Sequence, residues 1–404
     1  SRRQRQMCIR DRAKTLREAQ DMAVQALDMA QGRGGDQAAE MTPDGFTFYG
    51  GVSHGVEKRS KVRSRLVADQ LVKLIKEADH VVIMGHRMSD LDAIGAAEGV
   101  LRICKICDVP AVIAVRRDAT LAASLIDALC KAGQKDDFID PKDALPIISK
   151  RTLCIVVDTY QAGLVESKDI LEKCGKVAVI DHHRKGVGYI ENPALVCHEP
   201  YSSSASELVT ELLQYVGERD DKPNRVEAEG LLAGILLDTQ DFTLHTGVRT
   251  FEAAAALRRY GAETERVRRL FDVTMVEYNA KADLVEKAQM YKNCAISIGG
   301  EVAPEARVAI AQAANDLLRI QGVDASFVAV QVGNGVNVSA RSMGAVNVQV
   351  IMESLGGGGH QTMAAAQLKH ITPQAARSRI QDAIDQYYLS QKKTTPEARP
   401  AKGE

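Results

Sequence analysis

The strongest constraint on the fold is a regular alternation of short apolar runs and longer helical segments between residues 80 and 262. The runs are short and rich in β-branched residues, which is typical of buried strands. Strands that alternate with helices usually pair in parallel, because each connection crosses back over the sheet. We therefore predict an α/β fold with a mostly parallel, doubly wound sheet. Its strand candidates are HVVIM, VPAVIAV, TLCIVVD, KVAVID and ALVCHE, and its helix candidates are 93–107, 119–132, 204–216, 226–237 and 249–260.

The pattern changes after residue 262, which predicts further domains. Residues 263–292 lack glycine and proline and have helical spacing, so we expect linker helices there. Shorter alternating segments follow and predict a smaller α/β lobe, and the final polar, proline-bearing stretch predicts a disordered tail. The expected boundaries are 1–58 for an N-terminal segment, 59–262 for the larger domain, 263–292 for the linker, 293–390 for the smaller lobe and 391–404 for the tail.

Composition excludes several classes of function. The 404 residues carry a net charge of −1, whereas proteins that grip long nucleic acid are usually strongly basic. Eight scattered cysteines indicate reduced thiols, and Cys104 and Cys107 lack the second pair that a zinc site needs, so we interpret both as packing residues. No apolar run approaches the roughly 20 residues of a membrane span. We therefore expect this fragment to be cytoplasmic and to make no membrane contact.

Acidic and histidine residues recur where the predicted strands and one buried helix end. In open α/β sheets the carboxyl ends of the strands form the ligand crevice, so these side chains can converge there. Buried carboxylates without partners cost several kcal/mol each, and a cluster of them therefore needs a cation. The sequence predicts a metal site from His86, Asp90, Asp92, Asp158, Asp181, His182, His183 and Asp238.

The ligand types indicate which metal this site holds. Carboxylates with imidazole and no cysteine suit Mn²⁺ best, with Mg²⁺ or Co²⁺ as substitutes. These eight candidate residues exceed the needs of one ion. Two ions about 3.5–4 Å apart, bridged by a shared carboxylate, would form a centre for phosphoryl transfer. We therefore predict two Mn²⁺ ions.

A second candidate site lies in the stretch SLGGGGHQTMAAA, residues 354–366. Four consecutive glycines allow backbone N–H groups to approach an anion closely. A histidine follows them, and a serine and an arginine lie just upstream. We predict that a phosphate or nucleotide is held by Ser339, Arg341, Gly357, Gly358 and His360.

Five ordered motifs resemble the DHH phosphoesterase superfamily over about residues 65–388. GHRMSDLDAIGA, IVVDTY, VIDHHR and GILLDTQDF look like its four catalytic motifs. SLGGGGHQTMAAA looks like the glycine-rich signature of the DHH-associated C-terminal domain. The resemblance implies the two-lobed α/β fold and metal-dependent hydrolysis.

Within that superfamily the chain is most similar to the membrane-anchored cyclic di-AMP phosphodiesterases. GRGGDQ and FYGG resemble the end of a degenerate GGDEF-like domain, so residues 1–58 look like its remnant. This resemblance implies hydrolysis of cyclic di-AMP to linear pApA. It also implies a homodimer, and an intact protein anchored to the bacterial membrane with this part facing the cytoplasm.

The resemblance also implies residue roles. His86 and Asp90 would bind the first metal, and Asp158 would bridge the two ions. The second metal would be held by Asp92, His182 and Asp238. His183 would contact the scissile phosphate or support the site, and Asp181 would orient a neighbouring histidine. The glycine-rich lobe would hold the other phosphate and its sugar.

Several alternatives remain at this point. An oligoribonuclease or 3′-phosphoadenosine 5′-phosphate phosphatase of the same superfamily would share every metal ligand. A family II pyrophosphatase and a nucleotide sensor without catalysis are weaker alternatives. The sequence also leaves open whether cyclic di-AMP, cyclic di-GMP or linear pApA is the preferred substrate.

Overall fold

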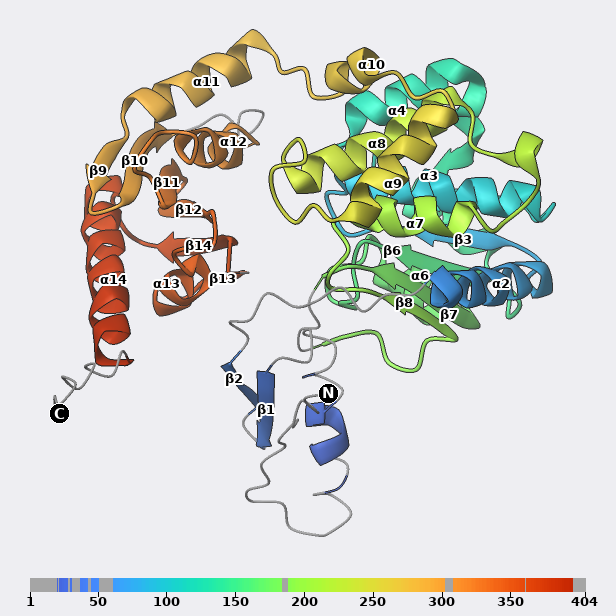
Figure 1. Cartoon of the computed structure of the whole chain (residues 1–404), viewed down its shortest axis with the longest axis horizontal. Helices are drawn as coiled ribbons and strands as arrows, with labels where there is room; N and C mark the ends of the chain where they lie inside the picture. Colours follow the sequence, from blue (N-terminus) through green and yellow to red (C-terminus); the bar gives the residue numbers. More distant parts are fainter. Residues whose placement is uncertain are drawn as a thin grey trace, which may run out of the picture. The chain divides into compact units, whose positions relative to one another are not determined.

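The computed structural model describes residues 20, 22–27, 30, 37–42, 45–50, 61–183, 188–301, 308–359 and 361–394 (Figure 1). The chain divides into two compact units, Ser1–Phe271 and Asp272–Glu404. Among the described residues of both units, no helix is long and apolar enough to cross a lipid bilayer.

The first unit is built on a six-stranded sheet in which every neighbouring pair of strands is parallel. Five of its strands lie where the sequence predicted them. The additional strand, β5, has only two residues and therefore gives no periodic signal in the sequence. The strands, in the spatial order β5-β4-β3-β6-β7-β8, are Phe138–Ile139, Ala111–Ala114, Val81–Met84, Leu153–Val157, Lys176–Asp181 and Leu195–His198.

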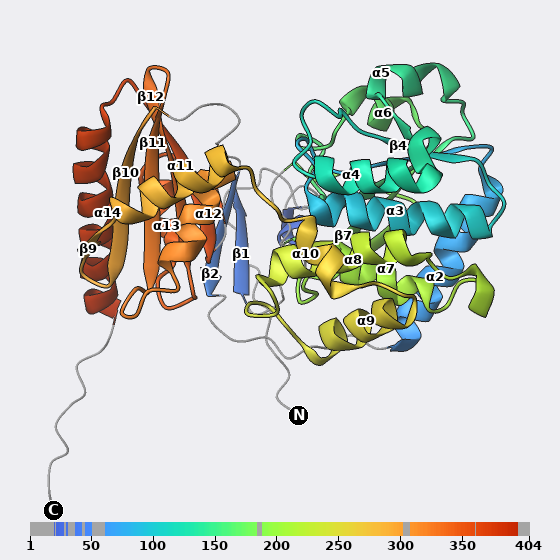
Figure 2. The same ribbon diagram turned by 90° about the horizontal axis from the view of Figure 1, so that it is seen from above.

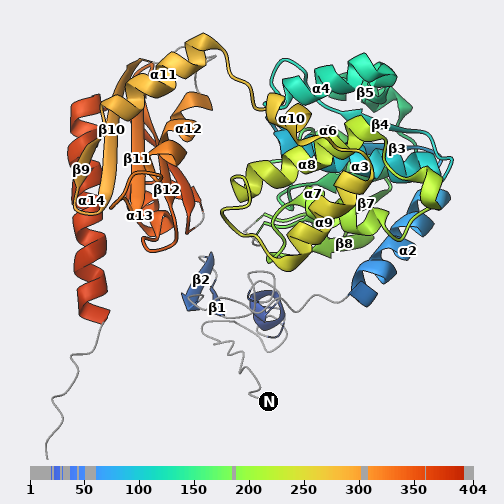
Figure 3. The same ribbon diagram turned by 45° about the horizontal axis from the view of Figure 1, so that its top comes forward.

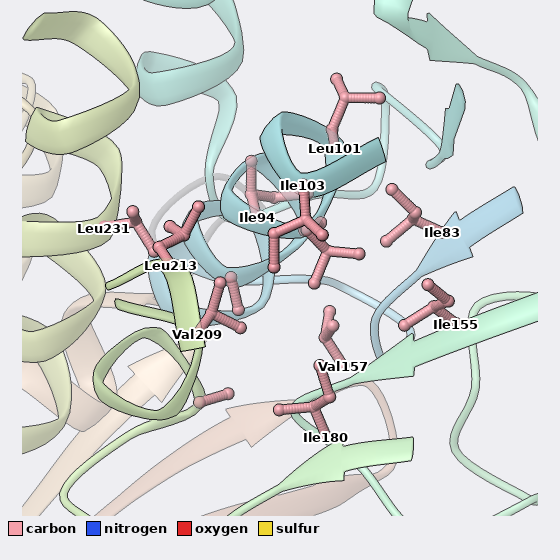
Figure 4. Close-up of a cluster of buried hydrophobic side chains, with 14 of the residues drawn as sticks. Ile83, Ile94, Leu101, Ile103, Ile155, Val157, Ile180, Val209, Leu213 and Leu231 are labelled. Carbon is pink, nitrogen blue, oxygen red and sulfur yellow. The ribbon is translucent and has the colours of Figure 1, made fainter. Parts of the chain in front are cut away.

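Helices cover both faces of this sheet, which confirms the predicted doubly wound α/β class. On one face the strands bury Ile83, Ile155 and Ile180 against helix residues such as Ile94 and Val209 (Figure 4). That layer contains α2 (Lys61–Glu77), α3 (Leu91–Ile106), α4 (Ala123–Leu129), α7 (Ala205–Leu213), α8 (Arg225–Thr239), α9 (Val248–Arg259) and α10 (Thr264–Arg269).

The alternate strand residues face a second cluster on the other side of the sheet. Val82, Cys154 and Val179 pack there with α5 (Pro141–Ala144) and α6 (Lys168–Lys173). Because successive side chains of a strand point to opposite faces, a strand buried on both faces is apolar throughout. This explains the continuous apolar runs in the sequence.

Helices α3 and α8 approach each other closely inside the first layer. A Cβ atom on Gly95 would lie 2.5 Å from the carbonyl oxygen of Gly230, so a residue larger than glycine at this position would force the helices to shift. Figure 3 shows α3 and α8 side by side, and this close packing fixes the two helices relative to each other.

The second unit contains another six-stranded sheet, in the order β13-β14-β12-β11-β10-β9 (Figure 2). Only β10 and β11 are parallel, and the other pairs are antiparallel. In that order the strands are Gly358–Gly359, Met363–Lys369, Gly335–Ser342, Ala325–Val332, Cys294–Glu301 and Gln289–Tyr291. Helices α13 (Val348–Ser354) and α14 (Pro373–Thr394) pack on one face, and α11 (Met275–Glu286) and α12 (Val308–Leu317) pack on the other.

The structure corrects two expectations for this half of the chain. Residues 289–291 were predicted to be helical, but they form strand β9 and pair with β10 through a tight turn at Lys292, whose φ is 54°. The predicted tail from residue 391 begins too early, because α14 continues to Thr394. Propensity favours helix in both segments, and for β9 the pairing with an adjacent strand overrides it.

Part of the N-terminal segment is also described. Strands β1 (Gln37–Thr42) and β2 (Gly45–Gly50) form an antiparallel hairpin. The rest of the segment expected at 1–58 lies largely outside the described residues, as do 395–404.

Candidate metal centre

The candidate centre lies where the strand order of the first sheet reverses. From β3 the chain proceeds to β4 and β5 on one side, and β6 then returns to pair with β3 on its other side. His86 follows β3, and Asp158 follows β6. In such sheets ligands bind at this switch point, beside the carboxyl ends of the strands. The fold therefore brings together residues 72 positions apart in the sequence (158 minus 86).

Asp158 occupies the centre of the cluster. Its backbone has φ of 58°, an unusual conformation for a residue other than glycine, and its N–H donates to the carbonyl of Ile180 at 2.9 Å. Its two carboxylate oxygens face different histidines. Oδ2 lies 3.4 Å from His86 Nε2, and Oδ1 lies 3.3 Å from His182 Nε2. Asp158 therefore belongs to three overlapping groups of potential ligands.

The first group contains His86, Asp90 and Asp158, whose ligand atoms all lie within 4.8 Å of one another. Asp90 caps the N-terminus of α3, where its Oδ1 accepts N–H bonds from Asp92 and Ala93. The Nδ1 atom of His86 lies 2.8 Å from the carbonyl of Arg87, which favours a proton on Nδ1 and directs the lone pair of Nε2 toward the carboxylates.

The second group contains Asp158 with Asp92, His182 and Asp238. Asp92 is fully buried in the first turn of α3, and Asp238 lies in the last turn of α8. His182 Nε2 lies 3.1 Å from Asp238 Oδ2 and 3.9 Å from Asp92 Oδ2. Because α3 and α8 pack tightly, these two carboxylates are held at a fixed separation.

The third group contains His183 with Asp158 and His182, and His183 also pairs with Asp181. The Nδ1 of His183 lies 2.8 Å from Asp181 Oδ1, and the backbone N–H of His183 donates to the same oxygen at 3.2 Å. His183 Nδ1 also lies 3.6 Å from Asp158 Oδ1. The fully buried Asp181 thus sets the orientation of the His183 ring.

Burial and mutual repulsion of the carboxylates perturb their pKa values. Burial raises the pKa of Asp92 well above its usual value, and the charges of Asp158 and Asp238 raise it further. Burial also raises the pKa of Asp238. Burial lowers the pKa of His86, but Asp158 and Asp90 outweigh this and raise it to about 11. The cluster therefore strongly attracts positive charge.

The donor set fits divalent cations. Asp158 Oδ1 and His182 Nε2 are buried and make no hydrogen bond among the described residues, which would be costly for a site that stays without a cation. Each group of potential ligands consists of carboxylate oxygens and imidazole nitrogens, and none of the groups contains a cysteine. Oxygen and nitrogen donors of this kind suit Mn²⁺, Mg²⁺ or Co²⁺.

The residues predicted to hold a phosphate lie in the second unit. Ser339 and Arg341 are on β12, and Gly358 is on β13, where it pairs with Ala365. Ser339 pairs with the same Ala365 from the other side of β14. Gly357 precedes β13, and a Cβ there would lie 2.1 Å from the Ala365 carbonyl, so strand packing already requires glycine at this position. His360 lies outside the described residues.

The residues that bind the Asp92 carboxylate were not predicted from the sequence. The backbone N–H groups of Ala205 and Ser206, at the start of α7, donate to Asp92 Oδ2 and Oδ1 at 2.7 and 2.8 Å. Gly234 on α8 also approaches closely, because a Cβ there would lie 2.6 Å from Asp92 Oδ1 and 2.3 Å from Ser206 Oγ. The stretch Ser204–Glu207 has the S-x-x-E pattern of a helix start. This pattern predicts the helix, but it does not reveal that the first N–H groups of the helix donate to the distant Asp92.

Comparison with known proteins follows the same two-unit division. Residues 80–235 match the DHH family, N-terminal domain, and residues 303–389 match the DHHA1 domain. The chain contains a DHH-family domain and a DHHA1 domain. The matched segments contain the metal cluster, apart from Asp238, and the glycine-rich stretch.

Curated relatives of this DHH chain are longer proteins. The chain is 45% identical over 380 residues to the cyclic-di-AMP phosphodiesterase GdpP of Geobacillus thermodenitrificans (strain NG80-2), an alignment that covers 93% of the chain and 58% of that protein. It is 40% identical over 376 residues to the cyclic-di-AMP phosphodiesterase PdeA of Listeria monocytogenes serotype 1/2a (strain 10403S), covering 91% and 57%. The chain thus spans less than two thirds of the length of these relatives.

A solved structure supports the fold. An exopolyphosphatase-related protein from Bacteroides fragilis is similar with a TM-score of 0.69 at 20% sequence identity, and the match covers 81% of this chain and 98% of that protein. At this level of identity the likeness concerns the architecture. It agrees with the α/β class predicted from the sequence.

Proposed function

We propose that this chain is a metal-dependent phosphodiesterase that hydrolyses cyclic di-AMP to linear pApA. The observation that carries the proposal is the position of Asp158, whose two oxygens face two different ligand groups. A carboxylate shared in this way is the arrangement expected in two-metal phosphoryl-transfer centres. The names of the curated relatives support cyclic di-AMP as the substrate.

Under this proposal, His86 and Asp90 hold one cation, Asp158 is shared, and the other is held by Asp92, His182 and Asp238. We propose Mn²⁺ for both positions, with Mg²⁺ or Co²⁺ as substitutes. When bound, the cations would supply neutralisation of phosphoryl charge and a lowered pKa for attacking water.

His183 would contact the scissile phosphate through the side of its ring that faces away from Asp181. Burial and the charge of His182 lower the pKa of His183, but Asp181 and Asp158 outweigh them and raise it above its usual value. A protonated His183 can donate to a phosphoryl oxygen and stabilise the charge that develops there. Asp181 keeps the ring in that orientation.

The second unit would hold the rest of the substrate. The Arg341 guanidinium donates to Ser339 Oγ at 3.1 Å, and among the described residues it has no carboxylate partner. Burial lowers the pKa of Arg341 to about 10, so it remains positively charged at neutral pH. Ser339, Arg341, Gly357, Gly358 and His360 form the proposed phosphate- and sugar-binding set.

We extend the proposal to the organisation of the intact protein. Residues 1–58 would be the end of a degenerate GGDEF-like domain, 59–262 the catalytic domain and 293–390 the substrate-binding domain. The intact protein would be a membrane-anchored homodimer with this part in the cytoplasm. Sedimentation of the purified chain and membrane fractionation of the full-length protein test these two points separately.

A parallel hydrolysis assay tests the function. With Mn²⁺, we expect turnover of cyclic di-AMP to exceed that of cyclic di-GMP, pApA, short linear RNA, 3′-phosphoadenosine 5′-phosphate and pyrophosphate. Asp158→Ala and Asp238→Ala should each lower kcat by about 10³-fold or more, because each removes several kcal/mol of charge stabilisation.

Asp79→Ala is the matched control. Asp79 lies just before β3 in the same unit, is exposed, and pairs with Arg151 at 3.1 Å rather than with the cluster. It should retain activity. Circular dichroism checks that all variants fold, and Mn²⁺-dependent hydrolysis that persists in either folded cluster variant would refute the assignment.

A further inference from the structure

One face of the second sheet is exposed along β14 and half-buried along β12 in the described part of the chain. Buried residues alternate with these positions in both strands, and on this face α12 packs over β11 and reaches β12. Apart from Met363, the side chains on this face are polar or small. They include Asn337, Ser339 and Arg341 on β12 and Met363, Ala365 and Gln367 on β14.

Two carboxamides lie next to each other on this face. Asn337 and Gln367 are direct cross-strand partners, so their Cβ atoms are about 4.5–5.5 Å apart. Asn337 Oδ1 is buried and makes no hydrogen bond among the described residues. A buried amide oxygen without a partner is rare, because leaving it unpaired costs free energy, and a ligand N–H would satisfy it.

The amide pair lies beside the proposed phosphate site. Ser339 is two residues from Asn337 along β12, a separation of about 7 Å. The row through Ser339 continues with the small residues Ala365 and Gly358, and a Cβ on Gly358 would contact nothing within 4 Å, so this row leaves open space beside the phosphate site. A ribose can occupy this space while its phosphate contacts Ser339 and Arg341.

We propose that Asn337 and Gln367 recognise the base of the bound nucleotide and select adenine over guanine. This inference rests on the proposed function for the phosphate end of the site. A carboxamide offers one acceptor and one donor, which match the N6 amino group and N7 of adenine. Guanine presents two acceptors, O6 and N7, on the same edge, so one carboxamide cannot satisfy both.

Equilibrium binding of 5′-AMP and 5′-GMP to the intact, Mn²⁺-loaded chain tests the proposal by calorimetry. Phosphate contacts, including any at the metal centre, are common to both nucleotides and cancel in the ratio of the two Kd values. The wild type should bind 5′-AMP more tightly. Asn337→Leu should reduce the preference by about 5- to 150-fold, the discrimination of one bidentate amide contact.

Two further variants keep the test decisive. Gln367 is exposed, so Gln367→Leu should fold normally and also reduce the preference. Gln331→Leu is the control, because Gln331 alternates with Val330 on β11 and so lies on the opposite face of the same sheet. It should keep the wild-type ratio. An unchanged ratio in both Asn337→Leu and Gln367→Leu, or a wild type without adenine preference, would overturn the proposal.

The outcome is distinguishable from that of the proposed function. Suppose that the wild type does not hydrolyse cyclic di-AMP, but binds 5′-AMP more tightly than 5′-GMP and Asn337→Leu lacks this preference. The proposed reaction is then wrong and the base recognition stands. If the wild type hydrolyses cyclic di-AMP and the variants keep the preference, the reaction stands and the base recognition is wrong.

Discussion

Gly234→Ala tests how the packing of α8 supports the candidate metal centre. The new Cβ would lie 2.3 Å from Ser206 Oγ and 2.6 Å from Asp92 Oδ1, so Asp92 or Ser206 must shift. Overpacking of this kind costs about 1–3 kcal/mol, and the higher helix propensity of alanine offsets about 1 kcal/mol. The free energy of unfolding should therefore fall by about 0–2 kcal/mol, which lowers Tm by at most about 8 °C.

The effect on metal affinity should be larger than this loss of stability suggests. Disturbing the groups that orient a ligand typically lowers metal affinity by about 10- to 100-fold. Calorimetric titration with Mn²⁺ should show one weakened site, the one that includes Asp92, while the site of His86 and Asp90 keeps its affinity. Thermal unfolding in chelator measures the stability change separately.

Gly99→Ala is the matched control for this experiment. Its Cβ would lie 2.5 Å from Val209 Cγ1 and 3.0 Å from Leu231 Cδ2, so it strains the same helix layer among apolar side chains only. It should lower Tm comparably and leave both Mn²⁺ affinities unchanged. Equal Mn²⁺ affinities in Gly234→Ala and Gly99→Ala would refute the role assigned to the packing around Asp92.

Two other predictions concern Mn²⁺ and pH. Mn²⁺ at 100 times its Kd should stabilise the folded chain by about 2.7 kcal/mol, which raises Tm by roughly 5–11 °C relative to the protein in chelator. The Asp158→Ala variant should lose most of this increase in Tm. An identical Tm of the wild type in Mn²⁺ and in chelator would contradict a metal site. Burial, with the charge of Glu227, raises the pKa of Glu98 from 4.5 to about 8, so the folded state keeps a proton that the unfolded state releases, and stability falls as pH rises between these values. Between pH 5 and pH 8 this loss amounts to about 3–4 kcal/mol, and Glu98→Gln should remove it in denaturant titrations at the two pH values. An equal fall in the free energy of unfolding of both proteins would disprove the prediction.

The sequence predicted the parts of this structure that depend on local pattern. The runs ending at Met84, Val157 and Asp181 are buried on both faces of the sheet, so they are apolar throughout and stand out from the helices. Because parallel strands end at one edge, His86 and Asp158 could be expected to meet.

Features that depend on distant partners were not predictable in the same way. The donors to Asp92 come from α7, more than 100 residues downstream, and nothing local marks them. Strand β9 has three residues and exists because it pairs with β10. The left-handed backbone of Asp158 likewise depends on its surroundings. The division of ligands between two metals came from the family resemblance rather than from spacing.

Anomalous scattering from a crystal grown with Mn²⁺ would show directly whether two cations share Asp158. We predict two manganese peaks about 3.5–4 Å apart. One should contact His86, Asp90 and Asp158, and the other should contact Asp158 with Asp92, His182 and Asp238. A single peak, or peaks that do not share Asp158, would contradict the two-metal centre.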